Sequence, residues 1–161
     1  MSSSYDRLTA LDNSFLMLER DNAYMHVAST QIYDGSSLRD QGSSIGIDRL
    51  RELTAASLYQ IPRYRQKLSW IPFQSRAVWH DDDRFNLDYH IRHTALPRPG
   101  TEAQLKRLSA RIMQQHLDRS RPLWELWLVD GLENDRFAVI SKAHHCMIDG
   151  VSGVDLLKIL M

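Results

Sequence analysis

The sequence contains little of the chemistry that marks secreted, membrane-spanning or nucleic-acid-binding proteins. Its 161 residues include one cysteine, which excludes an intrachain disulfide and a zinc site built from several cysteines. The 20 lysines and arginines balance 20 aspartates and glutamates, so the net charge of zero gives no support for binding nucleic acid. No apolar run approaches the length that spans a bilayer. We therefore expect a neutral protein of the cytoplasm.

The sequence also lacks internal repeats and a recognisable leader. Residues 1–7 have no apolar core behind a basic start, so no signal peptide is predicted. The sequence is compatible with peripheral contact with lipid, because an enzyme with an apolar substrate can work at a membrane interface without spanning the membrane. The length fits one domain, or one half of a larger two-lobed protein.

Hydrophobic spacing predicts that helices and strands alternate along the chain. Apolar residues at intervals of three and four predict helices near 10–19, where Asp12 and Asn13 offer a cap, and over 47–61, 101–116 and 151–160. Alternating apolar and polar residues predict strands at 23–33, 77–80, 89–96, 121–129 and 137–143, the last two joined as a hairpin. This order favours an α/β (α+β) fold, with a mixed sheet flanked by helices.

Three polar segments lie between these elements. Residues 34–46 contain three glycines and four serines, which indicates a surface loop. The basic cluster 63–67 fits a solvated face, and an internal ion pair is the alternative. Three aspartates at 81–83 fit a solvated turn better than a metal site, because adjacent side chains on an exposed turn rarely converge on one ion.

Chemically useful side chains concentrate in residues 144–150, with the sequence His144-His145-Cys146-Met147-Ile148-Asp149-Gly150. The apolar run 137–143 leads into this segment and the helix-like run 151–160 leads out of it. The segment therefore lies at a strand-to-helix junction, where packed elements on both sides can hold a side chain at a cleft. We treat the other candidate histidines, His26, His90, His93 and His116, as structural or surface residues.

Three chemistries are disfavoured for this segment. Adjacent histidines at a strand end point to opposite faces, so they do not readily share a metal. The serine that follows, Ser152, lacks the GxSxG spacing of a nucleophile elbow. A Cys146 nucleophile would face away from the imidazole next to it in sequence.

General base catalysis remains, because an imidazole near its ordinary pKa suits removal of a proton from a hydroxyl at neutral pH. Asp149 would then be architectural and would need a cationic partner, while Gly150 would permit a tight turn. The candidate partners are Arg63, Arg65, Arg119 and Arg121.

Residues 144–150 resemble the HHxxxDG motif of acyl-CoA-dependent acyltransferases related to chloramphenicol acetyltransferase and to the condensation domains of peptide synthetases. Further segments narrow this resemblance: the motif-supporting Pro122-Leu123-Trp124, residues 96–100, and residues 11–16 with 25–27. Together they resemble bacterial wax ester synthase/acyl-CoA:diacylglycerol acyltransferases over nearly the whole chain.

The resemblance implies a two-lobed chloramphenicol-acetyltransferase-like fold, of which residues 1–161 are the N-terminal lobe and the second lobe is absent from this chain. It implies transfer of a fatty acyl group from acyl-CoA, a co-substrate, to a long-chain alcohol or diacylglycerol, with no metal and no cofactor. The expected partners are these substrates, the C-terminal lobe and, peripherally, a membrane or lipid-droplet surface. One alternative is an acyltransferase with the same motif that uses a carrier-protein thioester as donor, or another alcohol or an amine as acceptor. The other alternative is a lobe that binds these molecules without catalysis.

The same resemblance implies a role for each motif residue. His145 would be the general base, and His144 would support its geometry or contact substrate. Asp149 would orient the loop through a buried arginine, with Arg65 as the first candidate and Arg121 as the second.

Overall fold

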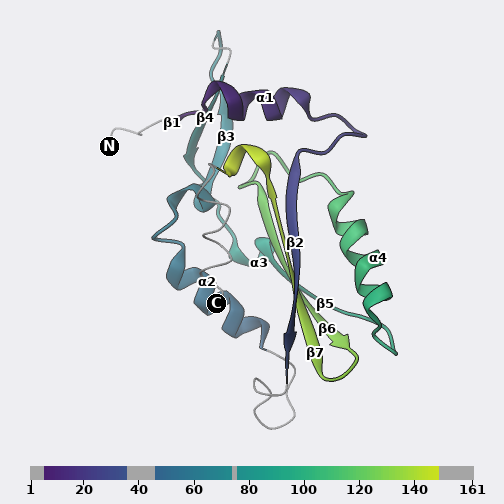
Figure 1. Ribbon diagram of the computed structural model, residues 1–161. Coiled ribbons are helices and arrows are strands. Elements are labelled where there is room, and N and C mark those ends of the chain that lie inside the picture. The colour runs from purple at the N-terminus through teal and green to yellow at the C-terminus, as the bar shows by residue number, and fades with distance from the viewer. Residues whose placement is uncertain (1–5, 36–45, 74–75, 149–161) are drawn as a thin grey trace.

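The computed structural model describes residues 6–35, 46–73 and 76–148, which form two β-sheets with helices around them (Figure 1). The larger sheet has the strand order β2-β7-β6-β5, in which β5 runs parallel to β6 and the other neighbours are antiparallel. Its strands span His26–Asp34 (β2), Ile91–Ala95 (β5), Trp124–Leu132 (β6) and Arg136–His144 (β7). The predicted mixed sheet flanked by helices is therefore confirmed.

The smaller sheet has the order β1-β4-β3 and spans Asp6–Arg7 (β1), Gln66–Trp70 (β3) and Ala77–Asp81 (β4). The strand expected at 77–80 is confirmed, whereas β3 lies partly in the basic cluster 63–67. Lys67 Nζ lies 2.7 Å from Asp82 Oδ1, and Asp82 is buried. The solvated-face interpretation is thus wrong for Lys67, and the solvated-turn interpretation is wrong for Asp82.

The helices span Ala10–Leu18 (α1), Ile47–Ser57 (α2), Leu87–His90 (α3) and Glu102–Met113 (α4), with 3₁₀ turns at Pro62–Arg65 (η1) and His145–Met147 (η2). The cap of α1 is Thr9, whose hydroxyl accepts the Asp12 N–H, so it precedes the predicted cap. α4 ends at Met113 rather than at His116, and Lys142 donates to carbonyls at this end. The helix expected at 151–160 lies outside the described residues.

The larger sheet buries apolar side chains on both faces. α4 covers one face with Leu105 and Ile112, which pack with Val129, Ala138 and Ile140 (Figure 1). The opposite face contacts Tyr64, Leu58 and the small sheet. Burial of each leucine or isoleucine of α4 stabilises the fold by about 1.5–3 kcal/mol. This two-sided packing leaves the end of β7 firmly supported.

None of the described helices is both long and apolar enough to cross a membrane.

Candidate active site

His144 is the last residue of β7 and is buried. Its Nδ1 accepts the backbone N–H of Cys146 at 3.1 Å, so the neutral ring carries its proton on Nε2. Nε2 faces Glu19 Oε2 at 3.5 Å. Burial lowers the pKa of His144 to about 4, although the negative charge of Glu19 acts in the opposite direction. Because this pKa lies well below 7, the ring is neutral at pH 7.

His145 begins η2 and has different neighbours. Its backbone N–H donates to the Met25 carbonyl at 2.7 Å, and its ring stacks on Phe15 of α1 with centroids 3.9 Å apart. The side chain is partly exposed, while Nδ1 is buried without a hydrogen-bond partner among the described residues. Nδ1 is therefore closed to a substrate, which would have to approach Nε2. The adjacent histidines contact different groups, as strand geometry predicts.

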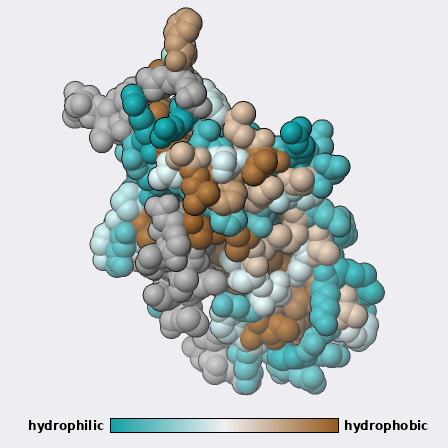
Figure 2. Space-filling model, turned by 45° about the horizontal axis from the view of Figure 1, so that its top comes forward, coloured by the Kyte–Doolittle hydropathy of each residue, from teal (hydrophilic) through white to brown (hydrophobic). Residues whose placement is uncertain are grey.

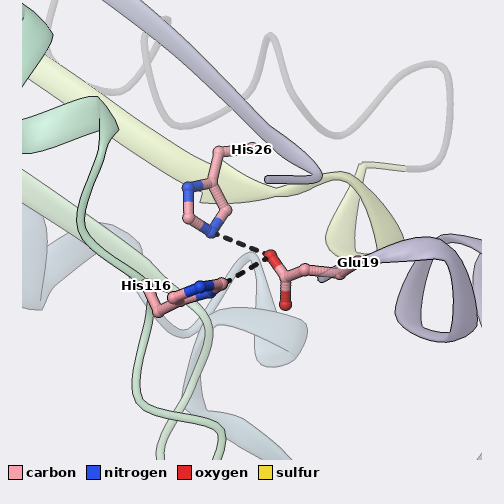
Figure 3. A group of neighbouring side chains, drawn as sticks. All are labelled: Glu19, His26 and His116. Atoms are coloured by element: carbon pink, nitrogen blue, oxygen red, sulfur yellow. Dashed lines mark ion pairs between the residues drawn. The ribbon is translucent and has the colours of Figure 1, made fainter. Parts of the chain in front are cut away.

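Glu19, the residue after α1, gathers side chains from other segments (Figure 3). Its Oε1 lies 3.2 Å from His26 Nε2 at the start of β2 and 3.9 Å from His116 Nδ1 beyond α4. Its Oε2 accepts a hydrogen bond from Arg119 Nη2 at 2.7 Å. Burial alone would raise the pKa of Glu19, but the hydrogen bond from Arg119 helps to lower it below its ordinary value. Glu19 is therefore a carboxylate at pH 7.

Glu19, His26 and His116 offer three potential ligand atoms within 4.8 Å of one another. Carboxylates and imidazoles are zinc ligands, but the single carboxylate here is already compensated by Arg119. The buried Lys142 also acts on His26, so a divalent cation would add to a surplus of positive charge. The charge balance favours a carboxylate–arginine pair flanked by imidazoles.

Cys146 lies inside the core and is a poor nucleophile. The residue is 3% exposed, and burial raises the pKa of its thiol to about 12. The reactive thiolate is therefore almost absent at neutral pH. The structure therefore agrees with the sequence-based expectation that Cys146 is not a nucleophile.

The Pro122-Leu123-Trp124 segment lies directly beside the motif. The Leu123 carbonyl accepts the His144 backbone N–H at 2.9 Å, and Trp124 pairs with Ala143 across β6 and β7. Trp124 is fully buried, donates from Nε1 to the Tyr64 carbonyl at 2.8 Å and stacks on His90. These contacts join the end of β7 to the core.

The predicted arginine partner of Asp149 stays a prediction, because Asp149 and Gly150 lie outside the described residues. Arg65 is exposed and borders a hollow of about 550 Å³ together with the aspartates 81–83. Arg121 lies 3.4 Å from Asp118 and over the ring of Tyr89. Arg119, another candidate, pairs with Glu19 instead.

Sequence reasoning missed Glu19 and treated His26 and His116 as unrelated. The signal was weak, because these residues lie in different predicted elements and share no spacing. His26 pairs with His144 in the antiparallel register of β2 and β7, a relation that alternation alone cannot reveal. The structure thus brings His26, His116 and His144 around one carboxylate that the sequence did not single out.

Comparison with known proteins relates the chain to one family. The model of the wax ester synthase/diacylglycerol acyltransferase catalytic domain matches residues 8–161. A Mycobacterium tuberculosis protein named "Probable diacyglycerol O-acyltransferase tgs3" is 42% identical over 149 residues, which are 92% of this chain and 53% of the relative. A second protein of that species, named "Probable diacyglycerol O-acyltransferase tgs1", is 37% identical over 94% of this chain and 32% of its own length.

Solved structures agree in fold. The wax ester synthase/diacylglycerol acyltransferase from Marinobacter aquaeolei VT8 superposes with a TM-score of 0.73 at 30% identity, covering 92% of this chain and 36% of that protein. The starter condensation domain of rhizomide synthetase RzmA gives 0.74 at 14% identity, a likeness of fold alone, over 98% of this chain and 38% of that one. The chain spans about half, or less, of the length of these proteins. It belongs to the wax ester synthase/diacylglycerol acyltransferase catalytic-domain family.

Proposed function

We propose that the intact protein transfers a fatty acyl group from acyl-CoA to a long-chain alcohol or diacylglycerol, with His145 as the general base. The observation that carries this proposal is the contrast between the two motif histidines. His144 is buried, with Nδ1 accepting from Cys146 and Nε2 facing Glu19, whereas His145 is partly exposed and has Nδ1 enclosed. Family membership supports an acyltransferase as the class of enzyme.

In the proposed reaction, His145 Nε2 takes the proton of the acceptor hydroxyl as its oxygen attacks the thioester carbonyl. A carbon–oxygen bond forms and the carbon–sulfur bond breaks. The proton then passes from His145 to the leaving thiolate, which leaves as free CoA. The transfer is direct and needs no covalent acyl-enzyme.

The remainder of the substrate-binding site belongs, in this proposal, to a second lobe. The relatives are longer than this chain, and the chain covers 53% of the tgs3 protein. Figure 2, which brings the α1 end of the molecule forward, shows hydrophobic side chains gathered on that face. The exposed apolar residues of α1 are Leu11, Met17 and Leu18. Such a face suits contact with the second lobe or with the surface of a membrane or lipid droplet.

The test is ester formation by the purified intact protein from palmitoyl-CoA and either hexadecanol or diacylglycerol. Wild type is expected to make ester, and His145→Ala is expected to lower kcat by about 10²–10⁴-fold, the usual contribution of a general base. His93→Ala serves as the control, because His93 is exposed on β5 and pairs with Asp130. Absence of ester from both acceptors, or full activity of His145→Ala, contradicts the proposal.

A further inference from the structure

The side chain of Glu19 is linked to two backbone contacts at the start of η2, one made by the His145 N–H and one by the Cys146 N–H. The first link runs through Met25. Glu19 Oε1 accepts the Met25 N–H at 3.3 Å, and the carbonyl of the same residue accepts the His145 N–H at 2.7 Å. The Glu19 carboxylate therefore contacts the same residue, Met25, whose carbonyl holds the backbone of His145.

The second link runs through His144. Glu19 Oε2 lies 3.5 Å from the Nε2 of His144, and Nδ1 of that ring accepts the Cys146 N–H at 3.1 Å. The carboxylate thus favours the tautomer in which Nδ1 is free to accept. The backbone N–H groups of His145 and Cys146, which begin η2, are both held by partners of Glu19.

The carboxylate is itself fixed in place. Arg119 Nη2 donates to Glu19 Oε2 at 2.7 Å and to the Leu16 carbonyl in the last turns of α1 at 3.1 Å. The side chain of Glu19 is 5% exposed. A buried carboxylate that accepts hydrogen bonds from Arg119 and Met25 has little freedom to move.

We propose that Glu19 is a positioning residue for acyl transfer, which holds the turn carrying His145 through Met25 and through His144 without touching the substrate. The catalytic consequence rests on the proposed function, whereas the structural consequence does not. A base displaced by about 1 Å can lose about 10²-fold in rate, so this distant carboxylate has leverage over the reaction.

The matched experiment compares Glu19→Gln with Asp82→Asn in the intact protein. Asp82 is an equivalent buried carboxylate, 4% exposed and 2.7 Å from Lys67, but it lies beside the small sheet. Glutamine keeps the size of Glu19, but its single oxygen cannot replace both carboxylate oxygens, one of which accepts from Met25 and the other from Arg119. Both variants remove one buried charge, so a difference between them reports position rather than general stability.

Glu19→Gln is expected to lower kcat by about 10- to 100-fold while the KM of both substrates changes less than about twofold. Asp82→Asn is expected to stay within about twofold of wild type in both constants. His144→Asn, whose side-chain oxygen can still accept from Cys146 but cannot reach Glu19, should mask part of the Glu19→Gln loss in the double variant.

An activity-independent readout is amide hydrogen exchange of His145 and Cys146. It should accelerate at least about tenfold in Glu19→Gln and not in Asp82→Asn. If wild type makes no ester, the proposed function fails and the exchange rates alone decide the role of Glu19. If wild type is active and Glu19→Gln matches Asp82→Asn in both kcat and amide exchange, the positioning role of Glu19 is overturned while the proposed function stands. Loss of wild-type activity in EDTA, restored by Zn²⁺, would reassign the cluster to a metal and also overturn it.

Discussion

Phe15 and His145 stack with ring centroids 3.9 Å apart and planes inclined by 27°. This contact joins the first helix of the chain to its functional motif and covers one side of the imidazole whose Nδ1 is buried. An aromatic pair of this kind contributes about 0.5–1.5 kcal/mol beyond the area it buries. The stacking therefore restricts the ring of His145 from a direction that its backbone contacts do not.

Replacing this support should impair catalysis more than stability. Phe15→Ala is expected to lower kcat about tenfold, because the imidazole gains freedom to leave its reactive orientation. The control is Tyr33→Leu, which removes the Tyr33–Phe137 stack at the other end of β2 and β7. Steady-state kinetics with palmitoyl-CoA and the preferred acceptor make the measurement. Equal kcat in the two variants would contradict a role for Phe15 in orienting His145.

Cys146 should resist alkylation in the native protein. Burial raises the pKa of its thiol to about 12, so very little thiolate exists at pH 8. Iodoacetamide is expected to leave the peptide containing Cys146 unmodified in buffer and to modify it fully in urea, as mass spectrometry would detect. Rapid modification under native conditions would mean that the thiol is exposed and ionised.

Burial of His90 should make stability depend on pH. His90 stacks on Trp124, and burial lowers its pKa to about 4. The folded protein then binds fewer protons than the unfolded chain, whose histidine titrates near 6.5, so stability is retained above pH 6.5 and lost as pH falls toward 4. The loss from this residue amounts to about 3 kcal/mol.

Urea unfolding of wild type and His90→Asn between pH 4 and 7.5 isolates this contribution. Asparagine can still donate to the Trp124 carbonyl, which His90 Nδ1 reaches at 2.8 Å, but it does not titrate. The difference in the free energy of unfolding between the two proteins should therefore vary with pH below 6.5. A constant difference over the whole range would show that His90 does not contribute.

The turn at Gly100 should not tolerate a side chain. Gly100 has φ of +78°, and a Cβ atom there would lie 1.8 Å from the carbonyl oxygen of Gly131. Gly100→Ala is expected to reduce the free energy of unfolding by more than about 2 kcal/mol, from strain and displacement of the facing backbone. Gly46→Ala is the control, since its Cβ would meet nothing closer than 3.8 Å. Similar melting temperatures for both variants would contradict this packing.

Local patterns along the sequence were sufficient for most of the larger sheet. Alternation located β2, β6 and β7 within a few residues, because each strand buries one or both faces against packed layers. Local patterns were insufficient for β3, because this strand begins among charged and polar residues and shows no apolar alternation there. Lys67 is accommodated in β3 by its ion pair with Asp82, which is visible only in the tertiary structure. The cap of α1 was misplaced because Asp12, a residue type that often caps helices, lies within the first turn, where its side chain accepts from the Thr9 hydroxyl at 2.6 Å.

The sequence by itself determined the candidate reactive segment, because two adjacent histidines before an aspartate and a glycine form a compact motif that needs no distant partner to be recognised. Only the tertiary structure decided which groups surround that segment. The β2–β7 register sets His26 beside His144, and the turn after α1 brings Glu19 between them. Such contacts depend on the pairing of strands far apart in the chain and on burial that excludes water, and neither leaves a periodic trace in the sequence.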